Sequence, residues 1–257
     1  MKKTILITGS TDGIGLETAR KLRANGHTVL VHGRSSSKLE KVAKDLDVET
    51  FKADLSSLRD TKKFANTILE KYKSIDVLIN NAGVYKTPSV NTNDGYDIRF
   101  MVNTFAPYLL AQTLLSILKN GRIINLSSAA QSSVDIEAML GNVELSDFEA
   151  YAQSKLAITM WSRHMAREVG DKGPLIIAVN PGSLLGTKMV KEGFNTSGND
   201  INIGVNILTS LSLDDEHREH HGEYYDNDNQ RYASAAADGL DDKKAQKIVE
   251  VIKKIIM

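Results

Sequence analysis

Short apolar segments alternate along the chain with longer segments that have helical periodicity. Near-continuous apolar character is typical of strands in a parallel sheet covered on both faces. The strand-like segments are residues 4–8, 28–31, 75–79, 122–126 and 175–179, with residues 48–53 as a weaker sixth. The helix-like segments are residues 13–25, 35–46, 57–73, 94–118 and 149–170. This alternation predicts an α/β fold, a doubly wound parallel sheet of the Rossmann type with helices on both faces.

No repeat or low-complexity linker divides the chain, so we expect residues 1–257 to form a single domain. Pro107 lies inside a predicted helix and should kink or split it, because proline removes a backbone donor. Residues 129–150 and 182–231 are irregular and follow strand ends, where an open α/β sheet binds its ligands. We expect both stretches to form substrate loops. The final helix, residues 241–257, is amphipathic, and we interpret it as a surface helix rather than a membrane anchor.

Composition narrows the class of protein. The 257 residues carry 32 Lys+Arg and 32 Asp+Glu. This balance argues against a nucleic-acid partner, because phosphate neutralisation needs clustered basic residues. The absence of Cys excludes disulfides and Cys-ligated metals and fits a reducing compartment. The first apolar stretch is too short for a signal peptide or a membrane span. We therefore expect a cytoplasmic location and no membrane partner.

A glycine-rich turn, TGSTDGIG at residues 8–15, follows the first predicted strand. Glycine permits a tight turn and lets backbone amides approach a pyrophosphate, and the next helix presents its positive N-terminal end. The turn is thus a candidate dinucleotide-binding site, and a plain tight turn is the alternative. The residues assigned to the cofactor here are Gly9, Ser10, Asp12, Gly13, Ile14 and Gly15.

Arg34 follows the second predicted strand, where a dinucleotide fold reads the 2′ position of the adenosine ribose. A guanidinium there suits a 2′-phosphate, whereas a carboxylate suits a free hydroxyl. No Asp or Glu occurs between His27 and Lys38, so NADP(H) is predicted over NAD(H). An ordinary surface arginine is the alternative. The third strand leads into Asp54 and Leu55, placed at the adenine, although Asp54 could instead cap a helix.

Tyr151 and Lys155 are four residues apart in a predicted helix and share one of its faces. A free phenol has a pKa near ~10 and is a poor proton shuttle at neutral pH. A neighbouring ammonium stabilises the phenolate and lowers that pKa. In isolation, such a pair fits an exposed helix equally well.

Together, these motifs resemble the short-chain dehydrogenase/reductase family, over nearly the whole chain. They occur in the family's order, namely residues 8–15, NNAG at 80–83, Asn103, Ser127-Ser128, YxxxK from Tyr151, and Pro181-Gly182. Residues 128–155 and 222–231 look most like the retinol-dehydrogenase-like branch.

The resemblance implies an oxidoreductase that transfers hydride between NADP(H) and a carbonyl/alcohol pair. Tyr151 would be the general acid or base, and Lys155 would lower its pKa and bind the nicotinamide ribose. Ser128 would hold the substrate oxygen, and Asn103 would join a water relay to Lys155. Ser127 or Ser128 could instead cap a loop, and Asn103 could satisfy backbone groups beside Pro107. The resemblance adds further cofactor residues, Asn81, Ala82 and Gly83 near the adenosine and Pro181, Gly182 and Thr187 near the nicotinamide.

Residues 129–150 contain Asp and Glu but no Lys or Arg, which should disfavour anionic substrates. We expect a neutral, apolar aldehyde, ketone or alcohol. The expected pocket residues are Val134, Ile136, Met139, Leu140, Leu145, Leu184, Leu185 and Met189. His217, His220 and His221 are interpreted as a solvated segment, so no metal site is predicted.

Trp161 is expected in the core or in a dimer interface. The resemblance implies a homodimer or homotetramer through residues 94–118 and 149–170. Two other classes of protein compete with the enzyme, a non-catalytic dinucleotide sensor on the same fold and a methyltransferase. Arg34 argues against the methyltransferase, which usually has an acid at that position.

Overall fold

The computed structural model describes residues 1–118 and 120–257, in which eight strands form one sheet. The strand order is β3-β2-β1-β4-β5-β6-β7-β8, parallel up to β7, with β8 antiparallel at one edge. The strands are β1 (Thr4–Ile7), β2 (Thr28–Gly33), β3 (Glu49–Lys52), β4 (Val77–Asn80), β5 (Arg122–Leu126), β6 (Leu175–Asn180), β7 (Tyr224–Asp226) and β8 (Arg231–Ala233). The six apolar segments are thus confirmed as strands.

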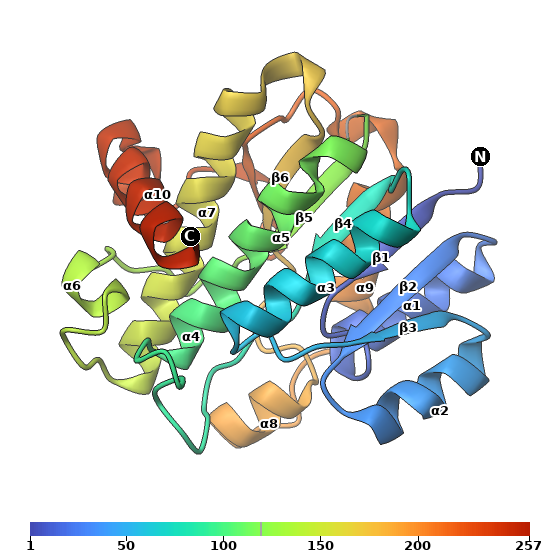
Figure 1. Cartoon of the computed structure of the whole chain (residues 1–257), viewed down its shortest axis with the longest axis horizontal. Coiled ribbons are helices and arrows are strands. Elements are labelled where there is room, and N and C mark those ends of the chain that lie inside the picture. Colours follow the sequence, from blue (N-terminus) through green and yellow to red (C-terminus); the bar gives the residue numbers. More distant parts are fainter. Residues whose placement is uncertain (119) are drawn as a thin grey trace.

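Successive residues of a strand point to opposite faces, so each strand contributes to two cores. In β1, Leu6 packs in one core while Ile5 and Ile7 pack in the other. The helices against the first core are α3 (Leu58–Lys71), α5 (Ala106–Leu114), α7 (Asp147–Val169) and α10 (Asp242–Ile256). Those against the second are α1 (Gly13–Ala24), α2 (Ser36–Leu46) and α9 (Asn202–Leu213). Figure 1 shows α3, α5 and α7 on one side of the sheet and α9 on the other. The doubly wound prediction is confirmed.

The helix predicted around Pro107 is not split, since it runs without a break from Ile98 to Ile117, but its type changes along its length. It consists of α4 (Ile98–Phe100), a π-helical turn (Met101–Phe105), α5 and a 3₁₀ turn (Leu115–Ile117). Pro107 lies in the first turn of α5, and without an N–H it cannot bond the carbonyl of Asn103, four residues earlier. The wider π-turn accommodates this missing hydrogen bond, and it contains Asn103 itself.

The segment predicted to be irregular after β6 is more ordered than its sequence suggests. It contains α8 (Lys188–Phe194), α9 and the β7–β8 hairpin. Residues 129–150 likewise contain the short helix α6 (Ile136–Met139). The expectation of continuous irregular structure in these stretches is therefore wrong.

Helix α7 is enclosed by its own chain. Every residue from Ala152 to Ser162 is buried, and α10, the π-turn, β5 and β6 pack around the helix. Trp161 is fully buried against Tyr108, so it belongs to the core and not to a dimer interface. The middle of α7 therefore presents no exposed surface, whereas Phe148 and Arg167 near its two ends are exposed. The oligomeric state itself stays a prediction.

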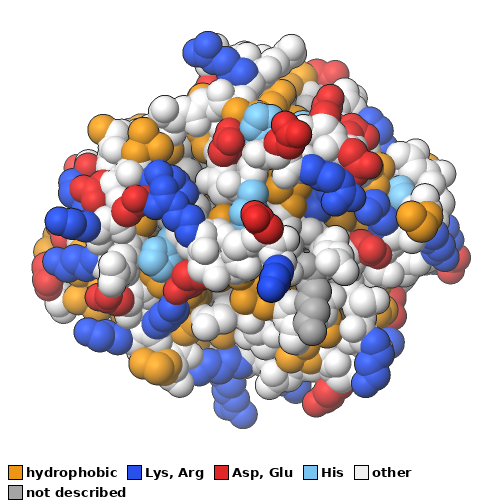
Figure 2. Space-filling model, turned by 90° about the horizontal axis from the view of Figure 1, so that it is seen from above, with side chains coloured by type: hydrophobic (Ala, Val, Ile, Leu, Met, Phe, Trp, Pro, Cys, Tyr) orange, Lys and Arg blue, Asp and Glu red, His pale blue; other side chains and the backbone are white. Residues whose placement is uncertain are grey.

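The segment Ile98–Ile117 is long and apolar enough to span a membrane by length and composition alone. However, 72% of its apolar window is buried inside the protein, as expected for a core helix. On the face shown in Figure 2, positive and negative side chains are interspersed. That face presents no continuous basic surface of the kind that binds nucleic acid.

Candidate active site

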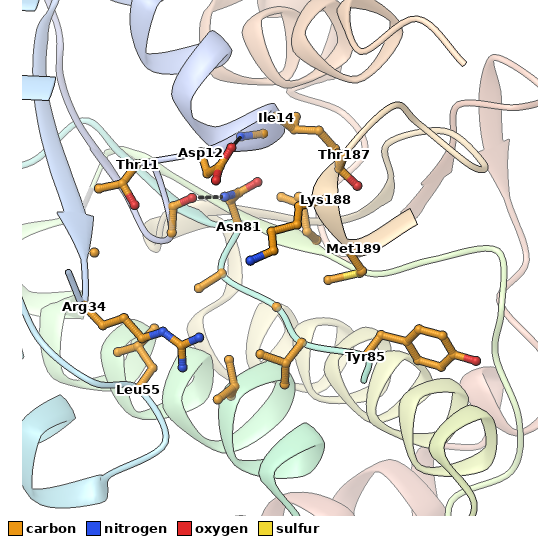
Figure 3. A pocket seen from close by; sticks show the side chains of 18 of the residues that line it. Thr11, Asp12, Ile14, Arg34, Leu55, Asn81, Tyr85, Thr187, Lys188 and Met189 are labelled. Atoms are coloured by element: carbon orange, nitrogen blue, oxygen red, sulfur yellow. Dashed lines mark hydrogen bonds between the residues drawn. The ribbon is translucent and has the colours of Figure 1, made fainter. Parts of the chain in front are cut away.

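A cavity of about 430 Å³ lies along the carboxyl ends of the central strands. Figure 3 shows Arg34 and Tyr85 at opposite ends of it, with Asn81 between them. Most residues assigned to the cofactor line this cavity, namely Gly9, Asp12, Gly13, Ile14, Arg34, Asp54, Leu55, Asn81, Ala82, Gly83, Tyr151, Lys155, Pro181 and Thr187. The structure therefore brings the glycine turn, Arg34 and the Tyr–Lys pair into one space.

Two glycines allow the turns after β1 and β4 to pack closely. Gly9 has a φ of +62°, and a Cβ on it would lie 2.8 Å from the Cα of Ala82. A Cβ on Gly15 would lie 2.4 Å from Nδ2 of Asn81. That same Nδ2 donates to the carbonyl oxygens of Thr8 and Gly9, at 2.9 and 3.0 Å. The amide thus locks the two turns together beneath the cofactor position.

Three residues assigned to the cofactor instead support the walls of the cavity. The Ser10 hydroxyl donates to the Ile7 carbonyl at 2.7 Å, and its backbone N–H donates to His32. Gly15 faces Asn81, as described above, and Gly182 adopts a φ of +126° beside Leu185. Ser10, Gly15 and Gly182 thus lie outside the lining of the cavity and support it through protein contacts, and their direct assignment to the cofactor stays a prediction.

Replacing Gly15 with Ala should destabilise the protein even though alanine favours helices. In an open helix this change would stabilise by about 1 kcal/mol. Here the new Cβ meets Asn81 and the Gly9 carbonyl, so we expect a net loss of about 2 kcal/mol in the free energy of unfolding. Urea denaturation measures the change, and Arg20→Ala on the exposed side of α1 is the control. A Gly15→Ala protein as stable as the wild type would contradict the close packing.

His32 is a supporting residue that the sequence interpretation missed. Its Nδ1 accepts from the Gly9 N–H at 3.1 Å, and its Nε2 bonds the Ala53 carbonyl at 3.2 Å. Its ring also stacks on Phe64, with 4.7 Å between centroids. Burial lowers the pKa of His32 to about 4, so the ring is neutral at pH 7 and matches one acceptor and one donor. It braces the turn after β1 against the end of β3.

The end of the cavity beside β2, where the adenosine is expected, is lined by Arg34, Lys38 and Asp54. Figure 3 shows Arg34 reaching into the cavity from the end of β2. The Asp54 carboxylate accepts from the backbone N–H and hydroxyl of Ser56, at 2.9 and 2.7 Å. The N-cap of α3 is Ser57, so the alternative role of Asp54 as a cap is wrong. Lys38 was not assigned from the sequence.

Helix α7 places Tyr151 and Lys155 one turn apart at the other end of the cavity. The helix begins at a capping box formed by Ser146 and Glu149, which fixes its first turn. The Lys155 ammonium lies 5.6 Å from the centroid of the Tyr151 ring and donates to the Leu126 carbonyl at 2.7 Å. Both side chains line the same wall.

Two adjacent serines after β5 have different surroundings. Ser127 is buried, and its hydroxyl donates to the Lys155 carbonyl at 2.8 Å and contacts the Thr159 hydroxyl. Ser128 forms the side-chain hydrogen bond to the Tyr151 phenol. Ser127 is thus held by protein partners while it also lines the cavity. Ser128 lies beside the candidate acid, although its hydroxyl also accepts from the Ala130 N–H, as a loop cap does.

Burial dominates the electrostatics of the Tyr–Lys pair in the unliganded chain. It raises the pKa of Tyr151, and the hydrogen bond from Ser128 opposes this rise. It also lowers the pKa of Lys155 to about 8. The expected lowering of the tyrosine pKa by Lys155 is absent from this arrangement, because the ammonium is directed to the Leu126 carbonyl.

The depressed Lys155 pKa predicts how stability changes with pH. Between pH 8 and 10.5 the unfolded chain keeps the Lys155 proton that the folded chain has lost, so raising the pH favours folding. From pH 7 to pH 9.5, we expect the unfolding free energy of the wild type to rise by about 2 kcal/mol relative to Lys155→Met. Urea denaturation without cofactor measures this difference. Lys44→Met, an exposed change on α2, is the control, and a difference that does not grow with pH would disprove the prediction.

Asn103 lies on the π-turn and is fully buried. Its Oδ1 accepts from the Val84 N–H at 2.8 Å, and its Nδ2 donates to the Val84 carbonyl and to Oγ of Ser154. It therefore satisfies backbone groups, but those of Val84 rather than groups beside Pro107. A Cβ on Gly83 would be 3.4 Å from Oδ1 of Asn103 and 3.6 Å from Nζ of Lys155, so both side chains border Gly83. The water relay stays a prediction.

The segment after β6 covers the middle of the cavity. Thr187 caps α8 by accepting from the Val190 N–H, and its methyl group would be 3.6 Å from a Cβ on Gly13. Figure 3 shows Lys188 reaching from this segment toward Asn81. The segment therefore faces the glycine turn as well as the catalytic end.

The acidic residues of 129–150 do not line the cavity as expected. Asp135 caps α6, Glu149 belongs to the capping box of α7, and Asp147 forms an ion pair with the buried Arg99. The charged groups that line this part of the cavity are Lys86, Lys155, Lys188 and Glu192. The argument from an acidic wall is therefore wrong.

Most of the apolar residues expected in the pocket also lie elsewhere. Val134, Ile136 and Leu145 pack against the first core, Met139 and Leu185 are buried, and Leu140 and Leu184 are exposed. Only Met189 of that set lines the cavity. Its apolar partners there are Val84, Tyr85, Val102 and Leu126. The Tyr85 ring meets the Tyr151 ring edge-on, with 5.2 Å between centroids.

The histidines near residue 220 have protein partners on their ring nitrogens. His217 bonds the hydroxyls of Ser210 and Tyr232, and His221 bonds the backbone at Ile176 and Ala166. Carboxylates of Asp214 and Glu216 lie near His217, but both of its nitrogens are already used. The arrangement is that of a hydrogen-bonded cluster.

Comparisons with known proteins extend this description. Residues 3–198 match the family described as short chain dehydrogenase. Retinol dehydrogenase 13 of Homo sapiens is 37% identical over 193 residues, which cover 70% of this chain and 58% of that protein. The chain thus spans about three fifths of the length of this curated relative.

Two solved structures are similar to the whole architecture. An uncharacterized protein from Mycobacterium paratuberculosis has a TM-score of 0.84 at 23% identity, covering 99% of this chain and 93% of that one. A short chain dehydrogenase from Escherichia coli CFT073, complexed with NADPH, has a TM-score of 0.72 at 26% identity. That match covers 88% of this chain and 96% of the other.

Proposed function

This chain belongs to the short-chain dehydrogenase family, close to its retinol-dehydrogenase-like branch, and on that premise we propose that it is an NADP(H)-dependent oxidoreductase acting on a carbonyl/alcohol pair. The observation that carries the proposal is a cavity with Arg34 at one end and Tyr151 and Lys155 at the other, where Ser128 is hydrogen-bonded to the Tyr151 phenol.

The cavity fits a dinucleotide. Gly9 leaves room for a close approach to the turn, and the N-terminus of α1 at Gly13 and Ile14 faces the cavity, where its amides favour phosphate. Arg34 would bind the 2′-phosphate through its forked donors. The NADPH-complexed structural relative supports the same choice over NAD(H). When bound, the nicotinamide supplies or accepts the hydride.

The residues around Tyr151 handle the proton. In reduction, the Tyr151 hydroxyl would donate to the carbonyl oxygen of the substrate, and in alcohol oxidation it would accept that proton. Ser128, hydrogen-bonded to the phenol, would hold the same oxygen in place. Lys155 would bind the nicotinamide ribose, and a water between Lys155 and Asn103 would replenish the proton.

A neutral, apolar substrate is supported by the residues that line the catalytic end. Val84, Val102, Leu126 and Met189 border Tyr151 there, and apolar walls favour apolar ligands. The name of the retinol dehydrogenase relative agrees with such a substrate. The cytoplasmic location, the lack of a membrane partner and an oligomer remain predictions from the sequence.

The competing proposal is a non-catalytic dinucleotide sensor. A sensor would need the glycine turn and Arg34 but would have no use for a phenol hydrogen-bonded to Ser128 in the same cavity. A methyltransferase is disfavoured by Arg34 and by the family match.

The test is oxidation of NADPH, followed at 340 nm, with a panel of neutral aldehydes and ketones of increasing chain length. We expect turnover with several members of the panel, rising with the length of the apolar chain because the wall beside Tyr151 is apolar. Tight NADPH binding without turnover of any member would favour the sensor. Best turnover with a multiply charged acid would refute the substrate class alone.

A further inference from the structure

Asp12 places a carboxylate on the turn that faces the proposed phosphate positions. Its Oδ1 accepts from the Gly13 N–H at 2.9 Å, which caps α1. Its Oδ2 lies 2.6 Å from Nζ of Lys38. Without a counter-charge, an acid at this position would repel a phosphorylated ligand.

Lys38 comes from the first turn of α2, just after Arg34 in the chain. It lines the same cavity as Arg34 and Asp12, so the ion pair crosses the adenosine end between the turn after β1 and the start of α2. The two side chains are 50% and 58% exposed. Ion pairs this exposed are weak and exchange partners readily.

The proposed 2′-phosphate is a better partner for Lys38 than Asp12 is. A phosphate carries more charge than a carboxylate and offers more acceptor oxygens. Lys188 of α8 lines the same cavity and is a second, weaker cationic influence on the Asp12 carboxylate. Both cations lower the pKa of Asp12, with the Lys38 hydrogen bond as the largest cause.

We propose that Asp12 and Lys38 form an electrostatic latch across the adenosine end of the cavity, and that the 2′-phosphate of NADP(H) opens it by taking the Lys38 ammonium from Asp12. Lys38 then adds selectivity for the phosphorylated cofactor, and Asp12 limits its affinity. This inference rests on the proposed use of NADP(H). In this proposal the affinity for the 2′-phosphate depends on Asp12 and Lys38 together, in addition to Arg34.

The test is isothermal titration of the unliganded protein with two probes, adenosine 2′,5′-bisphosphate and adenosine 5′-monophosphate, which differ only in the 2′-phosphate. The variants are Lys38→Met, Asp12→Asn and the double variant. Asparagine remains a good N-cap, so α1 should keep its first turn. Lys44→Met removes one positive charge from the exposed end of α2 and is the matched control.

Lys38→Met should weaken the bisphosphate about tenfold and the monophosphate less than about twofold. Asp12→Asn should raise the affinity for the bisphosphate by about three- to tenfold more than the affinity for the monophosphate. In the Lys38→Met background, Asp12→Asn should raise both affinities equally. The latch would be overturned if the effects of the two substitutions on the binding free energy of the bisphosphate were additive. It would also be overturned if Lys38→Met weakened the binding of both probes equally.

The titrations distinguish failure of the NADP(H) preference from failure of the Asp12–Lys38 latch. If the wild type does not prefer the bisphosphate, the NADP(H) assignment fails and the latch fails with it. If the wild type prefers the bisphosphate but the two substitutions act independently, only the latch is lost. In that case Arg34 alone would account for the preference.

Discussion

Replacing Tyr151 with Phe should lower kcat for carbonyl reduction by about 1000-fold, because positioned acid–base groups typically contribute between 100- and 10,000-fold. The change removes one oxygen and leaves the ring, its edge contact with Tyr85 and the fold of α7 in place. Cofactor affinity should change by less than about threefold, since a lost group that acts on the reacting oxygen affects the transition state rather than binding.

The measurement pairs steady-state NADPH oxidation with a fluorescence titration of NADPH for each protein. Tyr96→Phe, which alters a ring packed on Phe105 outside the cavity, is the control and should retain wild-type kcat. A Tyr151→Phe enzyme with near-normal kcat would remove the tyrosine from the proton-transfer step. A parallel loss of NADPH binding would instead indicate that the phenol holds the cofactor.

Replacing Arg34 with Glu should weaken NADPH binding by about 100-fold, through the loss of a charge-assisted pair and the added repulsion of a carboxylate from the 2′-phosphate. NADH, which has a free 2′-hydroxyl, should bind as well as before or better, because a carboxylate accepts hydrogen bonds from that hydroxyl. The ratio of the two dissociation constants is the quantity of interest, since it cancels general effects on the fold.

Arg231→Glu, on the exposed edge strand β8, makes the same charge change far along the sheet and serves as the control. Its cofactor ratio should equal that of the wild type. If Arg34→Glu left both affinities unchanged, Arg34 would be the ordinary surface arginine considered from the sequence. Measurement at two salt concentrations adds a check, because an exposed charge pair weakens as ionic strength rises.

The sequence predicted the sheet well because its strands are buried on both faces. Residues such as Leu6 and Ile7 enter different cores, so neither position tolerates a polar side chain and the apolar run is unbroken. The edge hairpin β7–β8 lacks this signal, since only Tyr224 in it is well buried. Helix α9 carried a signal that was overlooked, because Val205, Leu208 and Leu211 have helical spacing within a stretch that looked irregular.

The residues of the candidate site likewise fall into those that could be placed from the sequence and those that could not. Tyr151, Lys155 and Arg34 could be placed from the sequence because a fixed spacing to a strand or along a helix determines their positions. His32 could not, since its role depends on contacts with Gly9, Ala53 and Phe64 from three other segments. The acidic residues of 129–150 misled the substrate argument for a similar reason. A carboxylate that caps a helix and one that faces a pocket are indistinguishable in sequence.

The enclosure of α7 has a consequence for how the protein behaves on dilution. The helix that carries Tyr151 and Lys155 is held by α10 and by β5 and β6 of the same chain, so no second subunit is needed to fix the distance between the two side chains. The specific activity per chain should therefore be independent of protein concentration. If the proposed activity is confirmed, dilution should leave the turnover of each chain unchanged.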